Sequence, residues 1–249
     1  MQFKEFGSKE KETIILLHGG GLSWWSLQKI VEILEKDYHV VTPIIDGHGE
    51  DGENTFLSIE NSSQKLIEYI DSSFGGKVLA IAGLSIGAQI VTEVLSVRDD
   101  ITQYAIIESA LVLPIKGTAA MVSTYNLFYG LIKQRWFSKM QSKSLAVPEE
   151  WFERYFEDSL KISKQSLINI TLSNGNYKLK ATLSDTNAKV MIIVGEKELS
   201  IMKKSANMLH EAISGSELHI ARGLKHGELS IVYPQEYTEI LKDFMKTIQ

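Results

Sequence analysis

Short runs of apolar residues alternate along the chain with longer stretches in which apolar residues return every three or four positions. The short runs are rich in β-branched residues, which is typical of buried strands. They cover residues 2–6, 13–17, 38–45, 77–81, 103–107, 189–195 and 217–221, of which the first is the weakest. Helical spacing covers residues 23–36, 58–72, 86–97, 200–213 and 234–248. Strands that alternate with helices predict an α/β fold, a mostly parallel sheet flanked by helices on both faces.

The first predicted helix follows a glycine-rich loop at residues 18–21. Ser23 stands where its hydroxyl can cap this helix. Trp24, Leu27 and Leu34 fall on the face that the spacing turns toward the core. We therefore expect one continuous helix from Ser23 to Lys36.

Residues 111–186 interrupt the alternation and are too many for a loop in a compact domain. Their aromatic residues recur at helical spacing, in two bands: Tyr125, Phe128 and Tyr129, then Trp151, Phe152, Tyr155 and Phe156. We expect a mainly helical cap or lid over the strand ends, inserted into a core made of residues 1–110 and 187–249. Since a lid and a core helix both need an apolar face, extra core helices remain the alternative.

The composition is that of an ordinary soluble globular protein, with 44% hydrophobic and 23% charged residues in a chain of 249. The net charge of −5 argues against nucleic acid or an anionic membrane surface as a partner. The absence of cysteine excludes disulfides, thiolate zinc sites and cysteine nucleophiles. Neither a signal peptide nor a membrane span is apparent, so we expect a cytoplasmic, soluble protein.

Gly83-Leu84-Ser85-Ile86-Gly87 lies between a predicted strand and a predicted helix. In that setting the G-x-S-x-G pattern predicts a sharp, strained turn that lifts the serine hydroxyl clear of the sheet. Side chains at Gly83 and Gly87 would obstruct such a turn. Backbone N–H groups at the start of the following helix can face a developing oxyanion.

A serine hydroxyl needs a base to remove its proton as it attacks. Of the six histidines, His226 is the best placed, in a polar loop after the last predicted strand. A third group must orient the imidazole and stabilise its cation. The candidates are carboxylates that follow strands on the same sheet edge, namely Glu198, Glu196 and Glu108.

Four motifs together resemble the α/β-hydrolase fold family, in the family's order along the chain. His18-Gly19-Gly20 is similar to its oxyanion loop, and Asp46-Gly47-His48-Gly49 to a shortened D-x-x-G-H-G turn. Gly83 to Gly87 resembles its nucleophile elbow. Gly195-Glu196-Lys197-Glu198 and the loop from Gly223 to Gly227 resemble its acid and histidine loops. The resemblance covers essentially the whole chain.

This resemblance implies that Ser85 is the nucleophile, His226 the general base and Glu198 the orienting acid. It also implies an oxyanion hole made by the N–H groups of Ile86 and Gly20, with Gly21 as the alternative to Gly20. Relatives with a similar acid loop usually carry aspartate where this chain has Glu198, which leaves Glu108 as the chief rival. His18 and Asp46 are expected to brace the oxyanion loop and the following turn.

The function implied is that of a serine hydrolase of the carboxylesterase type. It would cleave a small, fairly apolar ester or thioester through an acyl-enzyme, with the aromatic insert lining the pocket. Two alternatives stay open: the same triad used for C–C bond hydrolysis or a lyase reaction, and a non-catalytic ligand receptor on the same fold. No metal-ligand cluster or phosphate loop is visible, so we expect no cofactor and no metal.

Overall fold

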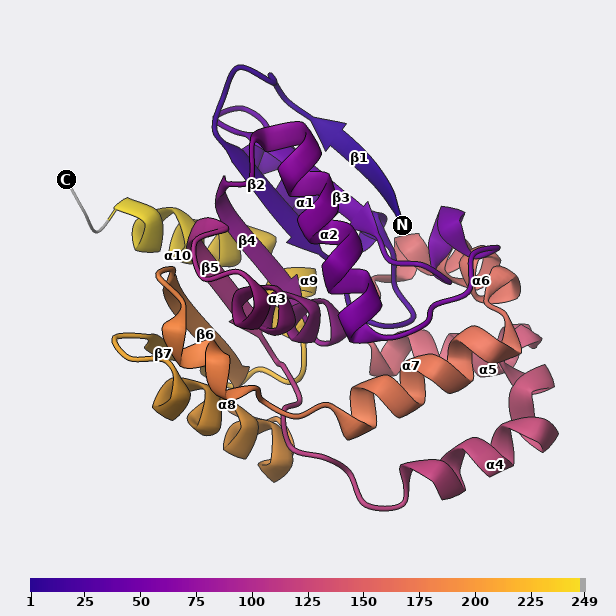
Figure 1. The fold of residues 1–249 in the computed structure, drawn as a ribbon. Helices are drawn as coiled ribbons and strands as arrows, with labels where there is room; N and C mark the ends of the chain where they lie inside the picture. Colours follow the sequence, from indigo (N-terminus) through magenta and orange to yellow (C-terminus); the bar gives the residue numbers. More distant parts are fainter. Residues whose placement is uncertain (247–249) are drawn as a thin grey trace.

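The computed structural model describes residues 1–246, except for the side chains of residues 126–128. Within this range the strands form one sheet in the order β1-β3-β2-β4-β5-β6-β7 (Figure 1). All neighbouring strands are parallel except β1, which pairs antiparallel with β3 at one edge. The strands are β1 (Gln2–Phe6), β2 (Thr13–Leu17), β3 (His39–Ile44), β4 (Val78–Leu84), β5 (Thr102–Glu108), β6 (Lys189–Gly195) and β7 (Glu217–Ala221). The predicted α/β fold is confirmed.

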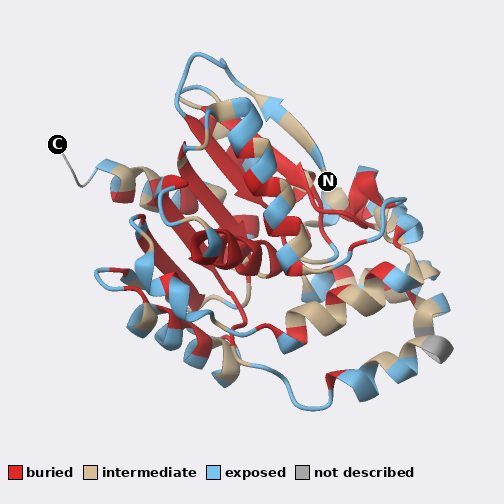
Figure 2. Cartoon of the chain, viewed as in Figure 1, coloured by how far each residue is buried: buried red, intermediate tan, exposed pale blue. Residues whose placement is uncertain are grey.

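Helices cover both faces of the sheet, which explains why its central strands are apolar throughout (Figure 2). On one face, α1 (Gln28–Leu34) and α10 (Pro234–Lys246) share a buried apolar cluster with β2 and β4. On the other face lie α2 (Ile59–Phe74), α3 (Ile86–Val97) and α8 (Ser200–Ala212). The short helix α9 (Glu228–Val232) connects the loop after β7 to α10.

The predicted start of the first helix is wrong. A 3-10 helix at Trp24–Leu27 precedes α1, and the Ser23 hydroxyl caps neither segment. It instead packs against Gly49, where an added Cβ would lie 2.2 Å from Ser23 Oγ, and it has no hydrogen-bond partner among the described residues. Leu27 and Leu34 are buried as predicted, whereas Trp24 is only partly buried and packs against Phe6.

Between β5 and β6 the chain forms only helical segments and connections. Its α-helices are α4 (Thr118–Phe128), α5 (Arg135–Ser144), α6 (Phe152–Lys161) and α7 (Lys164–Asn176), which lie beyond the carboxyl ends of the strands (Figure 1). Ile132, Ile162 and Ile170 belong to the same buried cluster as Ile107 of β5. The insert therefore shares one apolar core with the sheet, and the division into core and cap at residues 111–186 stays a prediction.

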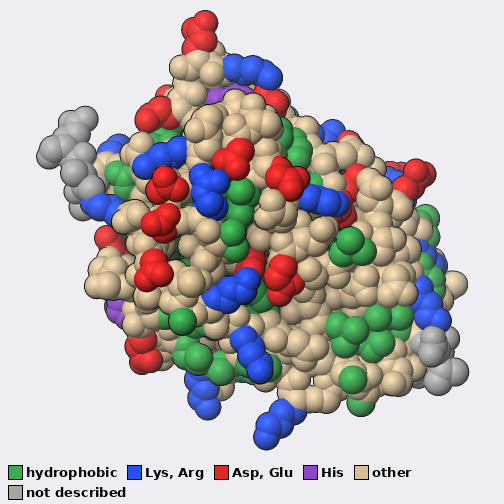
Figure 3. Space-filling model, in the orientation of Figure 1, with side chains coloured by type: hydrophobic (Ala, Val, Ile, Leu, Met, Phe, Trp, Pro, Cys, Tyr) green, Lys and Arg blue, Asp and Glu red, His purple; other side chains and the backbone are tan. Residues whose placement is uncertain are grey.

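The surface in view carries acidic and basic side chains interspersed over its upper part (Figure 3). Hydrophobic side chains gather at the lower right of the same view. No helix within residues 1–246 is both long and apolar enough to cross a lipid bilayer.

Candidate active site

Ser85 sits at a strained turn between β4 and α3. Its φ is +56° and its ψ is −115°, a backbone conformation that non-glycine residues rarely adopt. Both flanking glycines are required by space: a Cβ at Gly83 would lie 2.4 Å from the Gly87 carbonyl oxygen, and one at Gly87 would lie 2.6 Å from the His18 carbonyl oxygen. The turn is held to the next strand because the Ser85 N–H donates to the Glu108 carbonyl at 2.9 Å.

His226 and Glu198 are directly hydrogen-bonded. The distance from His226 Nδ1 to Glu198 Oε2 is 2.8 Å, and the carboxylate is fully buried while the imidazole is 41% exposed. The other carboxylate oxygen, Oε1, accepts from the Gly195 N–H at 2.8 Å and from the Ser109 hydroxyl at 2.7 Å. Burial alone would raise the pKa of Glu198, but these hydrogen bonds and the charge of His226 hold the pKa below its usual value. The carboxylate is therefore ionised at neutral pH.

The loop that carries His226 packs against the turn that carries Ser85. Gly227 has a φ of +69°, and a Cβ added there would lie 3.1 Å from Leu84 Cδ1. The residue after His226 thus touches the residue before Ser85. Among residues 1–246 the Ser85 hydroxyl makes no hydrogen bond, and it faces a cavity.

Two backbone N–H groups lie close to Ser85 without a partner. Those of Gly20 and Ile86 make no backbone hydrogen bond within the described residues, and Ile86 begins α3, where N–H groups lack helical acceptors. A Cβ at Gly20 would lie 3.7 Å from Ile86 Cγ2, so the two segments are neighbours. Gly21 also lines the cavity, so the choice between Gly20 and Gly21 as the second donor stays a prediction.

A cavity of about 310 Å³ opens beside Ser85, at the lower end of the size range of ligand pockets. Gly20, Ser85 and Ile86 line it from the sheet edge. The insert contributes an aliphatic wall: Ile132, Leu145, Ile162, Leu167 and Ile170. Asp158 is the one charged residue among the described residues that line it, and no lysine or arginine does so.

The sequence matches the model of the alpha/beta hydrolase family over residues 14–239. The chain belongs to this family. The (E)-2-((N-methylformamido)methylene)succinate hydrolase of Acinetobacter baylyi is 21% identical over 254 residues, which cover 97% of this chain and 93% of that protein.

Solved structures of other alpha/beta hydrolases share the fold. An esterase from Exiguobacterium antarcticum has a TM-score of 0.82 at 18% identity, with 98% of this chain and 95% of that chain covered. The enol-lactonase from Burkholderia xenovorans LB400 has a TM-score of 0.79 at 14% identity, with 98% and 96% covered. At such identities the likeness establishes the fold alone.

Glu108 occupies a different environment from that of Glu198 in this alpha/beta hydrolase. It is 2% exposed, Oε1 accepts from the Ser230 N–H at 3.4 Å, and Oε2 has no partner among the described residues. Burial raises the pKa of Glu108 to about 7, against the opposing effects of Ser230 and His226. Glu196, the third candidate, accepts from the Gly223 N–H at 2.7 Å and so holds the neighbouring loop. Of the three carboxylates, Glu198 alone is hydrogen-bonded to the imidazole.

We expect Glu108→Gln to stabilise the protein more at pH 8 than at pH 5. The folded-state pKa of about 7 lies above the ordinary value of 4.5, so the folded chain keeps a proton that the unfolded chain has lost. The free energy of unfolding of the wild type therefore falls as the pH rises from the unfolded-state pKa to the folded-state pKa. The neutral amide avoids this loss of stability, which is about 2 kcal/mol over that pH range. Urea denaturation at both pH values measures the difference. Exposed Glu10→Gln is the control, and parallel pH curves for Glu108→Gln and wild type would contradict the assignment.

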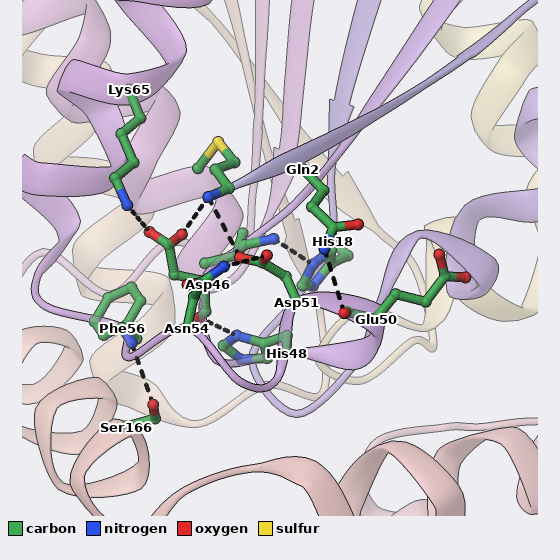
Figure 4. Close-up of polar contacts among 12 residues, drawn as sticks. Gln2, His18, Asp46, His48, Glu50, Asp51, Asn54, Phe56, Lys65 and Ser166 are labelled. Atoms are coloured by element: carbon green, nitrogen blue, oxygen red, sulfur yellow. Dashed lines mark hydrogen bonds and ion pairs between the residues drawn. The ribbon is translucent and has the colours of Figure 1, made fainter.

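His18 and Asp46 brace the loops around the cavity, as predicted (Figure 4). His18 Nε2 accepts from the Ile45 N–H at 3.1 Å, which ties the oxyanion-loop segment to the end of β3. Burial lowers the pKa of His18 to about 3, so the ring is neutral and can accept. Asp46 pairs with the amino group of Met1 and with Lys65 Nζ, the latter at 2.7 Å.

The expectation that the aromatic bands line the pocket is largely wrong. Phe152 is buried, and Trp151 packs beside it in a cluster that includes Trp25. Tyr125 is also absent from the cavity wall, and the side chain of Phe128 lies outside the described residues. Tyr155 is the exception and does line the cavity. The physical reason is that large aromatic rings fill the junction between insert and sheet, while aliphatic side chains face the cavity.

Sequence reasoning missed Ser109, His48 and Asp158. Ser109 comes directly after β5, on the same sheet edge as Ser85, and that position was the available signal. His48 was seen only as part of a turn, and no pattern within the insert singles out Asp158. Within residues 1–246, no group of three or more histidine, aspartate and glutamate side chains is arranged to hold a metal ion.

Proposed function

We propose that this alpha/beta hydrolase is a serine hydrolase that cleaves small carboxylic esters or thioesters through an acyl-enzyme. Ser85 is the nucleophile, His226 the general base and Glu198 the acid that orients the imidazole. The observation that supports it best is a strained serine that lines a cavity, on a turn packed against the loop whose imidazole is bonded to a buried carboxylate. Strained residues of this kind cluster at active sites.

The proposed reaction begins when His226 Nε2 removes the proton from Ser85 Oγ as that oxygen attacks the ester carbonyl carbon. Glu198 keeps the other imidazole proton on Nδ1, which leaves Nε2 free to act as a base. The N–H groups of Ile86 and Gly20 stabilise the negative charge on the carbonyl oxygen. The imidazolium then donates its proton to the leaving alcohol or thiol. A water activated by His226 releases the acid product and restores Ser85.

The cavity supports a fairly apolar substrate. Its aliphatic wall comes from residues 111–186, which we propose act as a cap that shapes the site. The Acinetobacter relative is named for a substituted succinate, which carries two carboxylates. The described lining of this cavity holds one carboxylate and no lysine or arginine, which disfavours such an anion here.

The test combines a fluorophosphonate probe with a series of p-nitrophenyl esters of rising acyl length. We expect the probe to add its mass to the peptide that contains Ser85, and short esters to be hydrolysed with release of p-nitrophenol. A non-catalytic receptor would show neither result. Rapid turnover of C–C bonded substrates with no ester hydrolysis would contradict the proposal and favour the alternative chemistry.

A further inference from the structure

Tyr155 carries a hydroxyl that makes no hydrogen bond to any of the described residues. The residue lies on α6 of the insert, is 4% exposed and lines the same cavity as Ser85. Burial raises the pKa of its hydroxyl to about 12, and no neighbouring charge or hydrogen bond contributes to that shift. Buried tyrosine hydroxyls usually find a partner. The other tyrosines of the insert do so: Tyr125 bonds to Thr171 Oγ1 at 2.8 Å, Tyr129 to the Ile162 carbonyl at 2.6 Å and Tyr177 to Glu93 Oε2 at 3.2 Å.

His48 lines the cavity, but its Nε2 atom, unpartnered among the described residues, is buried beneath the wall. The ring is buried, and its Nδ1 lies 3.0 Å from the Asp46 carbonyl oxygen. A carbonyl can only accept, so Nδ1 carries the proton and Nε2 is an acceptor. Nε2 has no partner within the described residues. In Figure 4 the ring lies on the side of the turn that faces α7, the helix that carries Ser166.

Asp158 sets the charge of this part of the cavity. It lies one helical turn after Tyr155, and its Oδ2 accepts from Trp25 Nε1 at 2.8 Å. A Cβ at Gly49 would lie 3.4 Å from the same oxygen, so the carboxylate is close to the turn that holds His48. Its cationic partner, Lys161, lies 3.0 Å from Oδ1 and does not line the cavity. Lys161 offsets part of the Asp158 charge from outside the cavity, but a substrate carboxylate placed here would meet a like charge and no lysine or arginine in the described lining.

We propose that Tyr155, supported by Asp158, selects esters that carry an uncharged hydroxyl substituent over esters that carry a carboxylate. A hydroxyl can accept from Tyr155 and can donate to Asp158. A carboxylate can only accept, and it is repelled by Asp158. Sites built to hydrogen-bond a substrate group discriminate against analogues that lack it, because their buried polar groups are then unpaired. Binding of the hydroxyl substituent does not depend on catalysis. Only its effect on the rate of turnover rests on the proposed ester hydrolysis.

Equilibrium binding to Ser85→Ala tests the recognition separately from catalysis. The probes are ethyl butanoate, ethyl 3-hydroxybutanoate and monoethyl succinate, measured by ligand-observed NMR. We expect ethyl 3-hydroxybutanoate to bind about three- to tenfold more tightly than ethyl butanoate, the effect of one hydrogen bond, and monoethyl succinate to bind most weakly. In Ser85→Ala/Tyr155→Phe the advantage of the hydroxyl should fall to about one. The matched control, Ser85→Ala/Tyr125→Phe, removes a hydroxyl that already has a partner and should keep the advantage.

Several outcomes would overturn this selectivity. They are an unchanged ratio in the Tyr155→Phe background, an equal loss of affinity for all three esters, and an absence of binding by any of them. Hydrolysis of the same esters by the wild-type enzyme is measured in parallel. A failure of all turnover alongside the expected binding ratios would reject the proposed hydrolysis and keep the recognition by Tyr155.

Discussion

Ser85→Ala should reduce kcat/KM for a short p-nitrophenyl ester by about 10⁴- to 10⁶-fold, as removal of a serine nucleophile does elsewhere. No other hydroxyl in the described chain combines a strained elbow with an opening to the cavity. Alanine accepts the backbone φ of +56° no worse than serine does, and the Ser85 hydroxyl makes no hydrogen bond to the described residues that would be lost. The fold should therefore be unaffected, which circular dichroism and thermal melting will show.

The matched control is Ser144→Ala, which removes an exposed serine hydroxyl of the insert outside the cavity. It should retain wild-type turnover. A folded Ser85→Ala protein with near-wild-type turnover would reject Ser85 as the nucleophile. Turnover lost together with the cooperative melting transition would instead mark Ser85 as a folding residue.

The strand ends and the elbow could be predicted because they are encoded locally. Gly83 and Gly87 sit where any Cβ would meet backbone atoms within 3 Å, so the sequence must hold glycine there if the turn exists. An apolar run before Ser85 and helical spacing after it then place the turn at the edge of the sheet. The hydrogen-bond partners of Glu198 could be predicted only in part. Because Ser109 directly follows a strand, it is expected at the same sheet edge as Glu198, but the sequence does not show that its hydroxyl points to the carboxylate.

The contents of the cavity could not be predicted, because they depend on how the insert packs on the sheet. Trp151 and Tyr155 are four residues apart, follow the same helical spacing and both pack in the junction, yet only Tyr155 also lines the cavity. Helical periodicity identifies the apolar face of a helix, but it does not show which residues pack against that face. The Ser23 cap failed for a similar reason, because its hydroxyl packs against Gly49 of a distant turn, a contact that helical spacing does not encode.

Glu198→Gln should lower kcat by about a thousandfold or more and leave KM nearly unchanged, by analogy with amide replacement of the acid in a protease triad. The hydrogen bonds fix how the amide will sit. Oε1 accepts from both the Gly195 N–H and the Ser109 hydroxyl, so the amide oxygen must stay there. The amide NH₂ then faces His226 Nδ1 and donates to it. The imidazole is driven to carry its proton on Nε2, where it can no longer take a proton from Ser85.

Glu108→Gln is the matched control. Glu108 and Glu198 lie at the carboxyl ends of neighbouring strands, close to the loop that carries His226. Glu108 makes no hydrogen bond to His226, and its raised pKa favours the neutral form that the amide imitates. Its kcat should therefore stay within a fewfold of wild type, and its effect should lie in the pH dependence of stability. If Glu108→Gln loses a thousandfold while Glu198→Gln remains active, the orienting acid lies one strand along the sheet. Losses of equal size in both variants would mean that the two carboxylates hold the imidazole together, and the assignment to Glu198 alone would be wrong.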